Sequence, residues 1–157
     1  MHADKAKKFL AIDHGDARIG LAVSDELGLW ARPLQIIQHV SREMDVQRIV
    51  ALAELEACDA FLVGVPYDQD GQIGPRARKV LRFVEVLKNM SDLQVVLWDE
   101  SHSTQDLTWL SIQKGESRHK RHVASDDRVA ALFLQAFLDA RVEQRQRTEK
   151  DEDGKKV

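Results

Sequence analysis

Residues 9–24 read FLAIDHGDARIGLAVS, and this stretch decides how the chain begins to fold. Phe9 to Asp13 is a short apolar run that ends in an acid, and Arg18 to Ser24 is a second apolar run. The four residues between the runs include a glycine and an aspartate, which are typical of turns. We therefore predict that the two runs pair as an antiparallel hairpin.

The pattern after this hairpin predicts a third strand and then an alternation of helices and strands. Residues 28–37 are extended, and Pro33 favours an edge position for them. Apolar residues at helical spacing predict helices over 46–57, 75–87 and 125–140, with a further helix after Ser103. Residues 60–65 and 94–98 have the pattern of buried strands. This order predicts an α/β fold: a five-stranded mixed sheet with Asp13 on its central strand and helices on both faces.

Length and composition predict one domain without disulfides. The chain has 157 residues, and we assign 1–148 to a single domain and 149–157 to a charged, disordered tail. The single cysteine, Cys58, excludes an intramolecular disulfide framework. Because Cys58 lies within a helical pattern, we predict that it is a buried small hydrophobe and not a nucleophile.

Charge and hydropathy exclude two classes of protein. The longest apolar runs have about six residues, against the ~20 that span a bilayer, and no export signal precedes the first strand. We therefore expect a cytoplasmic protein with no membrane partner. The formal net charge of −3 argues against a protein that coats nucleic acid, although it allows an enzyme with a local basic patch.

Acidic residues recur where the predicted strands end. Asp13 ends the first strand, Glu100 follows the last strand, and Asp126 and Asp127 open the final helix. Sites in open α/β sheets form at strand ends, and three carboxylates gathered there suit Mg²⁺ or Mn²⁺. Two such ions about 4 Å apart can clamp the attacking and leaving oxygens of a phosphodiester. Taken singly, each acid is equally explained as a helix cap or a solubilising residue.

Helical geometry separates the two adjacent acids. At about 100° per residue, Asp126 lies roughly 50° from the centre of the helix's apolar stripe, and Asp127 lies roughly 150° from that centre. We therefore predict that Asp126 is the ligand and that Asp127 faces solvent. The stripe comprises Val129, Leu132, Phe133, Ala136, Phe137 and Ala140.

A basic segment comes just before that helix. Residues 114–122 hold four basic residues, one acid and two histidines. If the acids meet at the strand ends, this segment can lie over them and contact phosphates. The alternative is an ordinary solvated loop. The basic residues are Lys114, Arg118, Lys120 and Arg121.

Several short blocks together resemble the YqgF/RuvX family. Asp13-x-Gly15 followed by Arg18 to Asp25 is similar to the opening of that family. The remaining blocks keep the family's order and spacing between about residue 8 and residue 140. They are Val63 to Pro66 with Asp70-Gly71, Trp98 to Glu100 with Ser103-Thr104, and Asp126 with Ala130 to Gln135.

The resemblance implies a fold, an activity and a set of residues. The fold is RNase H-like, of the RuvC type, and the activity is that of a metal-dependent nuclease. The family's acids fall on Asp13, Glu100 and Asp126, which are therefore the expected catalytic residues and ligands of Mg²⁺ or Mn²⁺. Arg18 and the basic segment are the expected contacts with nucleic acid.

The chain also departs from the family pattern. Ser101 replaces an arginine after the acid at position 100, and Asp68 stands where asparagine is frequent. Losing a cation and gaining an acid weakens the attraction of phosphate, unless Arg18 and the basic segment compensate.

Three functions therefore remain open. The first is an endonuclease that hydrolyses phosphodiesters of structured nucleic acid and matures the 5′ end of pre-16S rRNA. The second is a Holliday junction resolvase that acts on branched DNA, and the third is a non-catalytic RNA- or ribosome-associated module. A nucleotide-binding domain of actin-like type is disfavoured, because it needs a second lobe. Both a monomer and a homodimer are compatible with the sequence.

Overall fold

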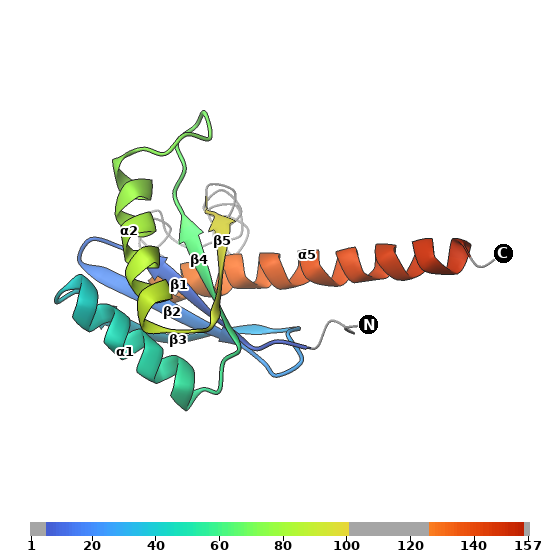
Figure 1. Cartoon of the computed structure of the whole chain (residues 1–157), viewed down its shortest axis with the longest axis horizontal. Helices are drawn as coiled ribbons and strands as arrows, with labels where there is room; N and C mark the ends of the chain where they lie inside the picture. Colours follow the sequence, from blue (N-terminus) through green and yellow to red (C-terminus); the bar gives the residue numbers. More distant parts are fainter. Residues whose placement is uncertain (1–5, 101–125, 156–157) are drawn as a thin grey trace, which may run out of the picture.

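The computed structural model describes residues 6–100 and 126–155, and its centre is a five-stranded mixed sheet. The strand order is β3-β2-β1-β4-β5, so β1 (Phe9–His14) is the central strand and Asp13 lies on it, as predicted. β1 pairs antiparallel with β2, β2 pairs antiparallel with β3, and β4 and β5 continue in parallel from β1 (Figure 1). The other strands are β2 (Arg18–Ser24), β3 (Ala31–Gln38), β4 (Ala60–Val65) and β5 (Gln94–Asp99).

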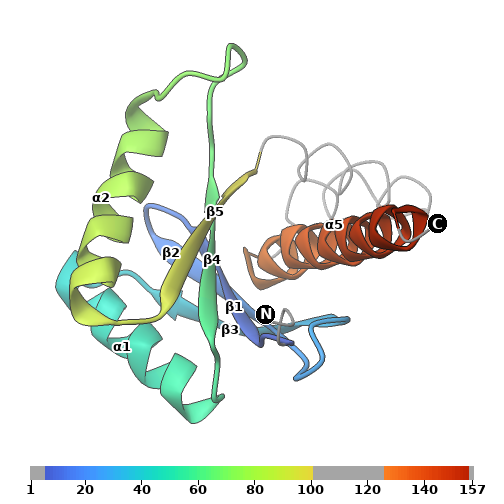
Figure 2. The same cartoon turned by 45° about the vertical axis from the view of Figure 1, so that its right-hand side comes forward.

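Helices cover both faces of the sheet, which confirms the predicted layers. α1 (Arg42–Leu55) and α2 (Pro75–Met90) lie on one face, and α5 (Asp126–Gly154) lies on the other (Figure 2). Along β1, Leu10 and Ile12 belong to the core under α1 and α2, whereas Phe9 and Ala11 belong to the core under α5. Because side chains alternate along a strand, the next residue on the α5 face is Asp13, and His14 belongs to the α1–α2 face.

The edges of the sheet differ in part from expectation. β3 is an edge strand, which accommodates Pro33 as predicted. It begins at Ala31 and not at residue 28, because the carboxylate of Asp25 accepts the backbone N–H groups of Leu29 and Trp30 and closes a turn there. β5 is the other edge, and its residues are half-buried or exposed, so the prediction of a buried strand was wrong.

α2 begins where predicted, whereas α1 both begins and ends earlier than the predicted 46–57. Pro75 is the first residue of α2, a position that needs no backbone N–H. α1 ends at Leu55, because Ala57 adopts a φ of 53° in the left-handed region that closes helices. Cys58 therefore follows the helix, although it is buried as predicted, and burial raises the pKa of its thiol to about 11.

The apolar stripe of α5 is rotated by about one residue from the predicted one. Phe133 is buried as predicted, but the other fully buried positions are Ala130, Leu134 and Leu138, whereas Ala140 is exposed. α5 also continues to Gly154, past the start of the expected tail at 149, because its Glu, Lys, Arg and Gln residues have high helix propensity. In the described ranges, none of the helices is long and apolar enough to cross a membrane.

Candidate active site

Asp13 and Glu100 meet where β1 and β5 end, at the carboxyl ends of these parallel strands. Glu100 directly follows β5, and its backbone N–H donates to the carbonyl of Val65 at the end of β4 at 3.1 Å. The side chains of Asp13 and Glu100 share a hydrogen bond. Two carboxyl groups can share a hydrogen bond only if one of them carries a proton. The structure therefore brings together two of the three predicted acids.

The environment of Asp13 favours that proton. Burial is the largest influence, followed by the hydrogen bond to Glu100 and repulsion from Glu100 and Asp126, and together they raise the pKa of Asp13 to about 9. The positive charge of Arg76 acts in the opposite direction. Asp13 thus lies in a cluster of negative charge that a cation would relieve.

Asp126 is the third acid, and it comes from α5, the helix that covers the face of the sheet on which Asp13 lies. It is the first residue of α5, and its Oδ2 lies 3.6 Å from Nε of Arg18 at the start of β2. The exposed side chain of Arg18 thus lies beside the acids, where a nucleic-acid contact was predicted. Repulsion from Asp126 contributes to the raised pKa of Asp13. Glu100 and Asp126 are therefore both within electrostatic reach of Asp13.

The two adjacent acids of α5 differ in contact but not in burial. Asp127 is half-buried, like Asp126, so the prediction that it faces solvent was wrong. The rotation of the apolar stripe explains the error, because it brings Asp127 closer to the covered side of the helix. What distinguishes the pair is that Asp126, unlike Asp127, is among the largest influences on the pKa of Asp13. Its Oδ1 accepts the backbone N–H of Arg128 at 2.9 Å.

Two glycines beside Asp13 make this convergence feasible. Gly20 on β2 lies directly opposite Asp13, and a Cβ there would lie 2.1 Å from the backbone carbon of Asp126. Gly64 on β4 leaves space for Glu100, whose Oε2 lies 3.3 Å from the position of such a Cβ. The crowding at Gly20 comes from the backbone of Asp126 and Asp127 in α5. Only the packing of α5 against β2 shows this role.

The donor set fits a hard divalent cation. Carboxylate oxygens from three elements are the ligands that Mg²⁺ and Mn²⁺ prefer. Among residues 6–100 and 126–155, no three His, Cys, Asp or Glu side chains already form a metal-binding cluster. The ion pair with Arg18 holds Asp126. Reorientation of that carboxylate toward Asp13 and Glu100 would complete a three-carboxylate set.

Other predicted residues are outside the site or outside the described ranges. Asp68 lies in the connection between β4 and α2, where its Oδ1 accepts the backbone N–H groups of Asp70 at 3.1 Å and Gln72 at 2.7 Å. This carboxylate shapes a turn, a role that asparagine also performs. The replacement of the family's frequent asparagine by Asp68 is therefore compatible with the same turn. Ser101 and the predicted nucleic-acid contacts Lys114, Arg118, Lys120 and Arg121 lie outside the described residues.

The sheet order and the two helical layers define an RNase H-like fold of the RuvC type. The chain is similar to the solved structure of T. thermophilus RuvC in complex with a Holliday junction substrate, with a TM-score of 0.54 and 20% identity, over 87% of this chain and 96% of that one. A second structure of Thermus thermophilus RuvC has a TM-score of 0.52 and 18% identity over the same shares of the two chains.

Sequence comparison then defines the family. Residues 7–140 match the family model described as "RuvX: Holliday junction resolvase", and the chain belongs to this family. A relative from Desulforudis audaxviator is 34% identical over 134 residues, covering 85% of this chain and 95% of its own length. A relative from Carboxydothermus hydrogenoformans is 37% identical over 131 residues, covering 83% and 95%. Both are named "Putative pre-16S rRNA nuclease".

Proposed function

We propose that this protein is a cytoplasmic, metal-dependent endonuclease that hydrolyses phosphodiester bonds of structured nucleic acid, with the 5′ end of pre-16S rRNA as its substrate. The observation that carries the proposal is the convergence of Asp13, Glu100 and Asp126 at one edge of the sheet. Membership of the RuvX family supports the reaction class, and the names of the relatives support the RNA substrate.

The three carboxylates act together as the cation site. When bound, Mg²⁺ or Mn²⁺ supplies Lewis-acid activation of water and stabilises the charge that develops on the leaving oxygen. The carboxyl of Asp13 carries a proton in the cation-free protein and loses it when the cation enters, since the cation removes the repulsion among the acids. Arg18 lies beside Asp126, where it orients the carboxylate and attracts the phosphate that is to be cleaved.

A cleavage assay with two paired variants tests the proposal. Asp126→Asn and Asp127→Asn remove the same charge from neighbouring positions of α5, so they are matched controls for each other. We expect Asp126→Asn to lower the cleavage rate at least about hundredfold, because it removes a direct ligand, and Asp127→Asn to change it much less. The assay compares a 5′-extended 16S rRNA fragment with a four-way DNA junction, each with Mg²⁺, Mn²⁺ or a chelator.

Each outcome of the assay has a distinct meaning. Cleavage of the RNA that needs the metal and Asp126 supports the proposal. Preferential cleavage of the junction identifies a Holliday junction resolvase instead, which the family description and the RuvC fold favour as the second candidate. No cleavage of either substrate by the wild type, with binding retained, identifies a non-catalytic module. A monomer and a homodimer are then distinguished by the mass of the protein bound to each substrate.

A further inference from the structure

A second feature lies at the same end of β1 as Asp13 but on the opposite face of the sheet. It is a cavity of about 360 Å³ between the end of β1, the start of α1 and one flank of α2. The proposed cleavage site does not use this cavity, because Asp13 belongs to the α5 face and His14 to the α1–α2 face. The residues that line the cavity are His14, Asp16, His39, Arg42, Lys79 and Arg82.

The lining carries an excess of positive charge. Lys79 pairs with the exposed carboxylate of Asp16 at 3.1 Å, which leaves the charges of Arg42 and Arg82 uncompensated. In the part of the chain that the structure describes, neither of these arginines forms an ion pair. When both histidines are neutral, the three cationic side chains and the one carboxylate give the lining a net charge of about +2. Such a lining attracts an anion.

The cations continue from the cavity toward the cleavage site. Arg76, Lys79 and Arg82 follow one another at intervals of three residues, so they occupy one flank of α2 over roughly 9 Å. A smaller cavity next to the first shares Lys79 with it and adds Arg76. Arg76 acts electrostatically on Asp13, so this flank of α2 ends within electrostatic reach of that acid. Since successive nucleotides of one strand of a duplex advance about 3.4 Å, the flank is long enough for more than one phosphate.

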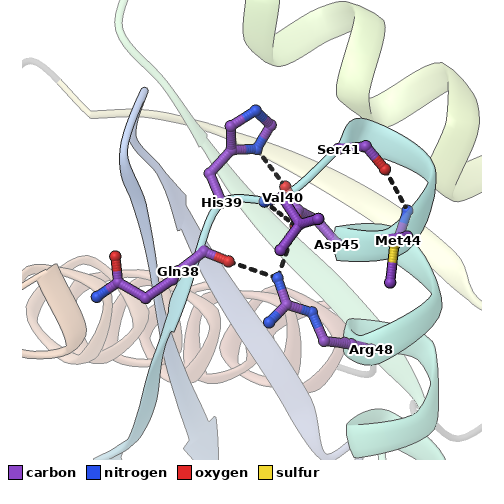
Figure 3. Close-up of polar contacts among 7 residues, drawn as sticks. All are labelled: Gln38, His39, Val40, Ser41, Met44, Asp45 and Arg48. Carbon is purple, nitrogen blue, oxygen red and sulfur yellow. Dashed lines mark hydrogen bonds and ion pairs between the residues drawn. The ribbon is translucent and has the colours of Figure 1, made fainter.

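The wall of the cavity opposite α2 is held in place by a buried carboxylate. Asp45 is fully buried in α1, and it accepts hydrogen bonds from His39, the backbone N–H of Val40 and Arg48 (Figure 3). Burial acts to raise the pKa of Asp45, but these hydrogen bonds outweigh it and hold the pKa below its usual value. The network fixes the turn between β3 and α1, and therefore the first turn of α1, which carries Arg42.

We propose that the cavity and the basic flank of α2 bind the sugar–phosphate backbone of the nucleic-acid substrate, next to the segment that is cleaved. Arg42, Lys79 and Arg82 contact the phosphates, and Arg76 leads the strand toward Asp13. This inference rests on the proposed nuclease function, but it concerns a surface separate from the acids. It assigns substrate binding to described residues outside the basic segment at 114–121 that the sequence predicted.

Binding without cleavage is the measurement that tests this surface. The fluorescence anisotropy of a labelled RNA duplex and of a labelled four-way DNA junction is followed in chelator over a series of salt concentrations. We expect the triple variant Arg42→Gln, Lys79→Gln and Arg82→Gln to bind at least about tenfold more weakly near 0.1 M salt, with a salt slope smaller by about 2 to 3. Lys88→Gln is the matched control, because Lys88 is exposed in the last turn of the same helix and lines neither cavity.

A variant that is expected to bind more tightly excludes misfolding as an explanation. Among the described residues that line the larger cavity, Asp16 is the only one with a carboxylate, so Asp16→Asn removes that charge and releases Lys79 from its ion pair. We therefore expect Asp16→Asn to tighten binding by about two- to fivefold, a gain that damage to the fold does not produce.

The outcomes separate this inference from the proposed function. If the wild type cleaves with metal but the triple variant binds with unchanged affinity and salt slope, the binding surface is wrong and the nuclease proposal stands. A loss of affinity in Lys88→Gln that equals the loss per charge in the triple variant also overturns it, since the effect is then that of net charge alone. If the wild type binds the substrates with the expected variant effects but does not cleave them, the surface stands and the nuclease function fails. If the wild type binds no nucleic acid, both fail.

Discussion

Asp13 illustrates how a single residue can oppose stability in order to make a site. It is a half-buried carboxyl on the central strand, next to Glu100 and Asp126, and its pKa is raised to about 9. A buried acid among other acids is unfavourable in the charged form. The surrounding core compensates for this, because β1 is otherwise fully apolar from Phe9 to Ile12. This unfavourable environment supports the chemical role that we propose for Asp13.

This arrangement predicts a stabilising substitution at the candidate site. In chelator, Asp13→Asn should raise the free energy of unfolding by at least about 1 kcal/mol at pH 8, because asparagine needs no proton. The sign follows from proton binding: the folded wild type holds a proton between the unfolded pKa of 3.8 and the folded pKa of about 9, so its stability falls as the pH rises through that window. Urea unfolding at pH 5, 7 and 8.5 measures the effect.

The control for this prediction is Asp127→Asn. Asp127 is not among the largest influences on Asp13, so its substitution should leave the pH dependence of the wild type nearly unchanged. Parallel stability curves for the wild type and Asp13→Asn across the three pH values would contradict the prediction.

At the scale of elements, the site depends on how closely α5 approaches β2. The first residue of α5 lies over Gly20, which has no side chain to separate the helix from the sheet. The apolar side chains Ala130, Phe133, Leu134 and Leu138 then hold the helix along the sheet. The position of Asp126 is therefore set by the packing of a whole helix, and a small change at Gly20 acts on the site through that packing.

Two glycine substitutions distinguish contact with backbone from contact with side chains. In Gly20→Ala the new Cβ meets the backbone of Asp126, so we expect α5 to shift, stability to fall by about 2–3 kcal/mol and cleavage to be lost. In Gly64→Ala the new Cβ meets the ring of Phe133 at 3.0 Å and the carboxylate of Glu100, which can move. The loss of stability should therefore be smaller. Urea unfolding and the cleavage assay measure both variants, and equal effects would contradict this reading of the packing.

At the scale of the whole molecule, the chain divides into a packed body and a projecting helix end. The last fully buried side chain of α5 is that of Leu138, whereas the helix continues to Gly154 and extends away from the sheet in Figure 1. From Thr148 onward the described residues of the helix are exposed. The helix end therefore adds little apolar burial to the fold.

Removal of residues 149–157 tests where the domain ends. We expect the shortened chain to keep its free energy of unfolding within about 0.5 kcal/mol and to cleave at the wild-type rate, since the removed residues that the structure describes are exposed. A thermal or urea unfolding curve and the cleavage assay provide the measurement. A large loss of stability would place the end of the domain after 148, and a loss of cleavage alone would assign the helix end a role in substrate binding.

The sequence by itself predicted the order of the described strands and helices, the two faces of the sheet and the acids that act on Asp13, whereas the helix expected after Ser103 lies outside the described residues. These follow from local periodicity and from blocks such as residues 9–24, where each residue's preference agrees with its neighbours. Asp13 could be placed at the end of a strand because an acid after an apolar run is visible in the sequence.

Only the tertiary structure decided how the elements lie against one another. The sequence could not show that β5 is an edge strand, that the buried stripe of α5 passes through Ala130 and Leu134, or that Gly20 accommodates a helix. The sequence also did not reveal the basic flank of α2, because its cations lie near Arg42 and line a common cavity only after folding. The physical reason is the same in each case. Burial, close approach and net charge at a surface are sums over residues distant in the chain, and no local pattern contains them.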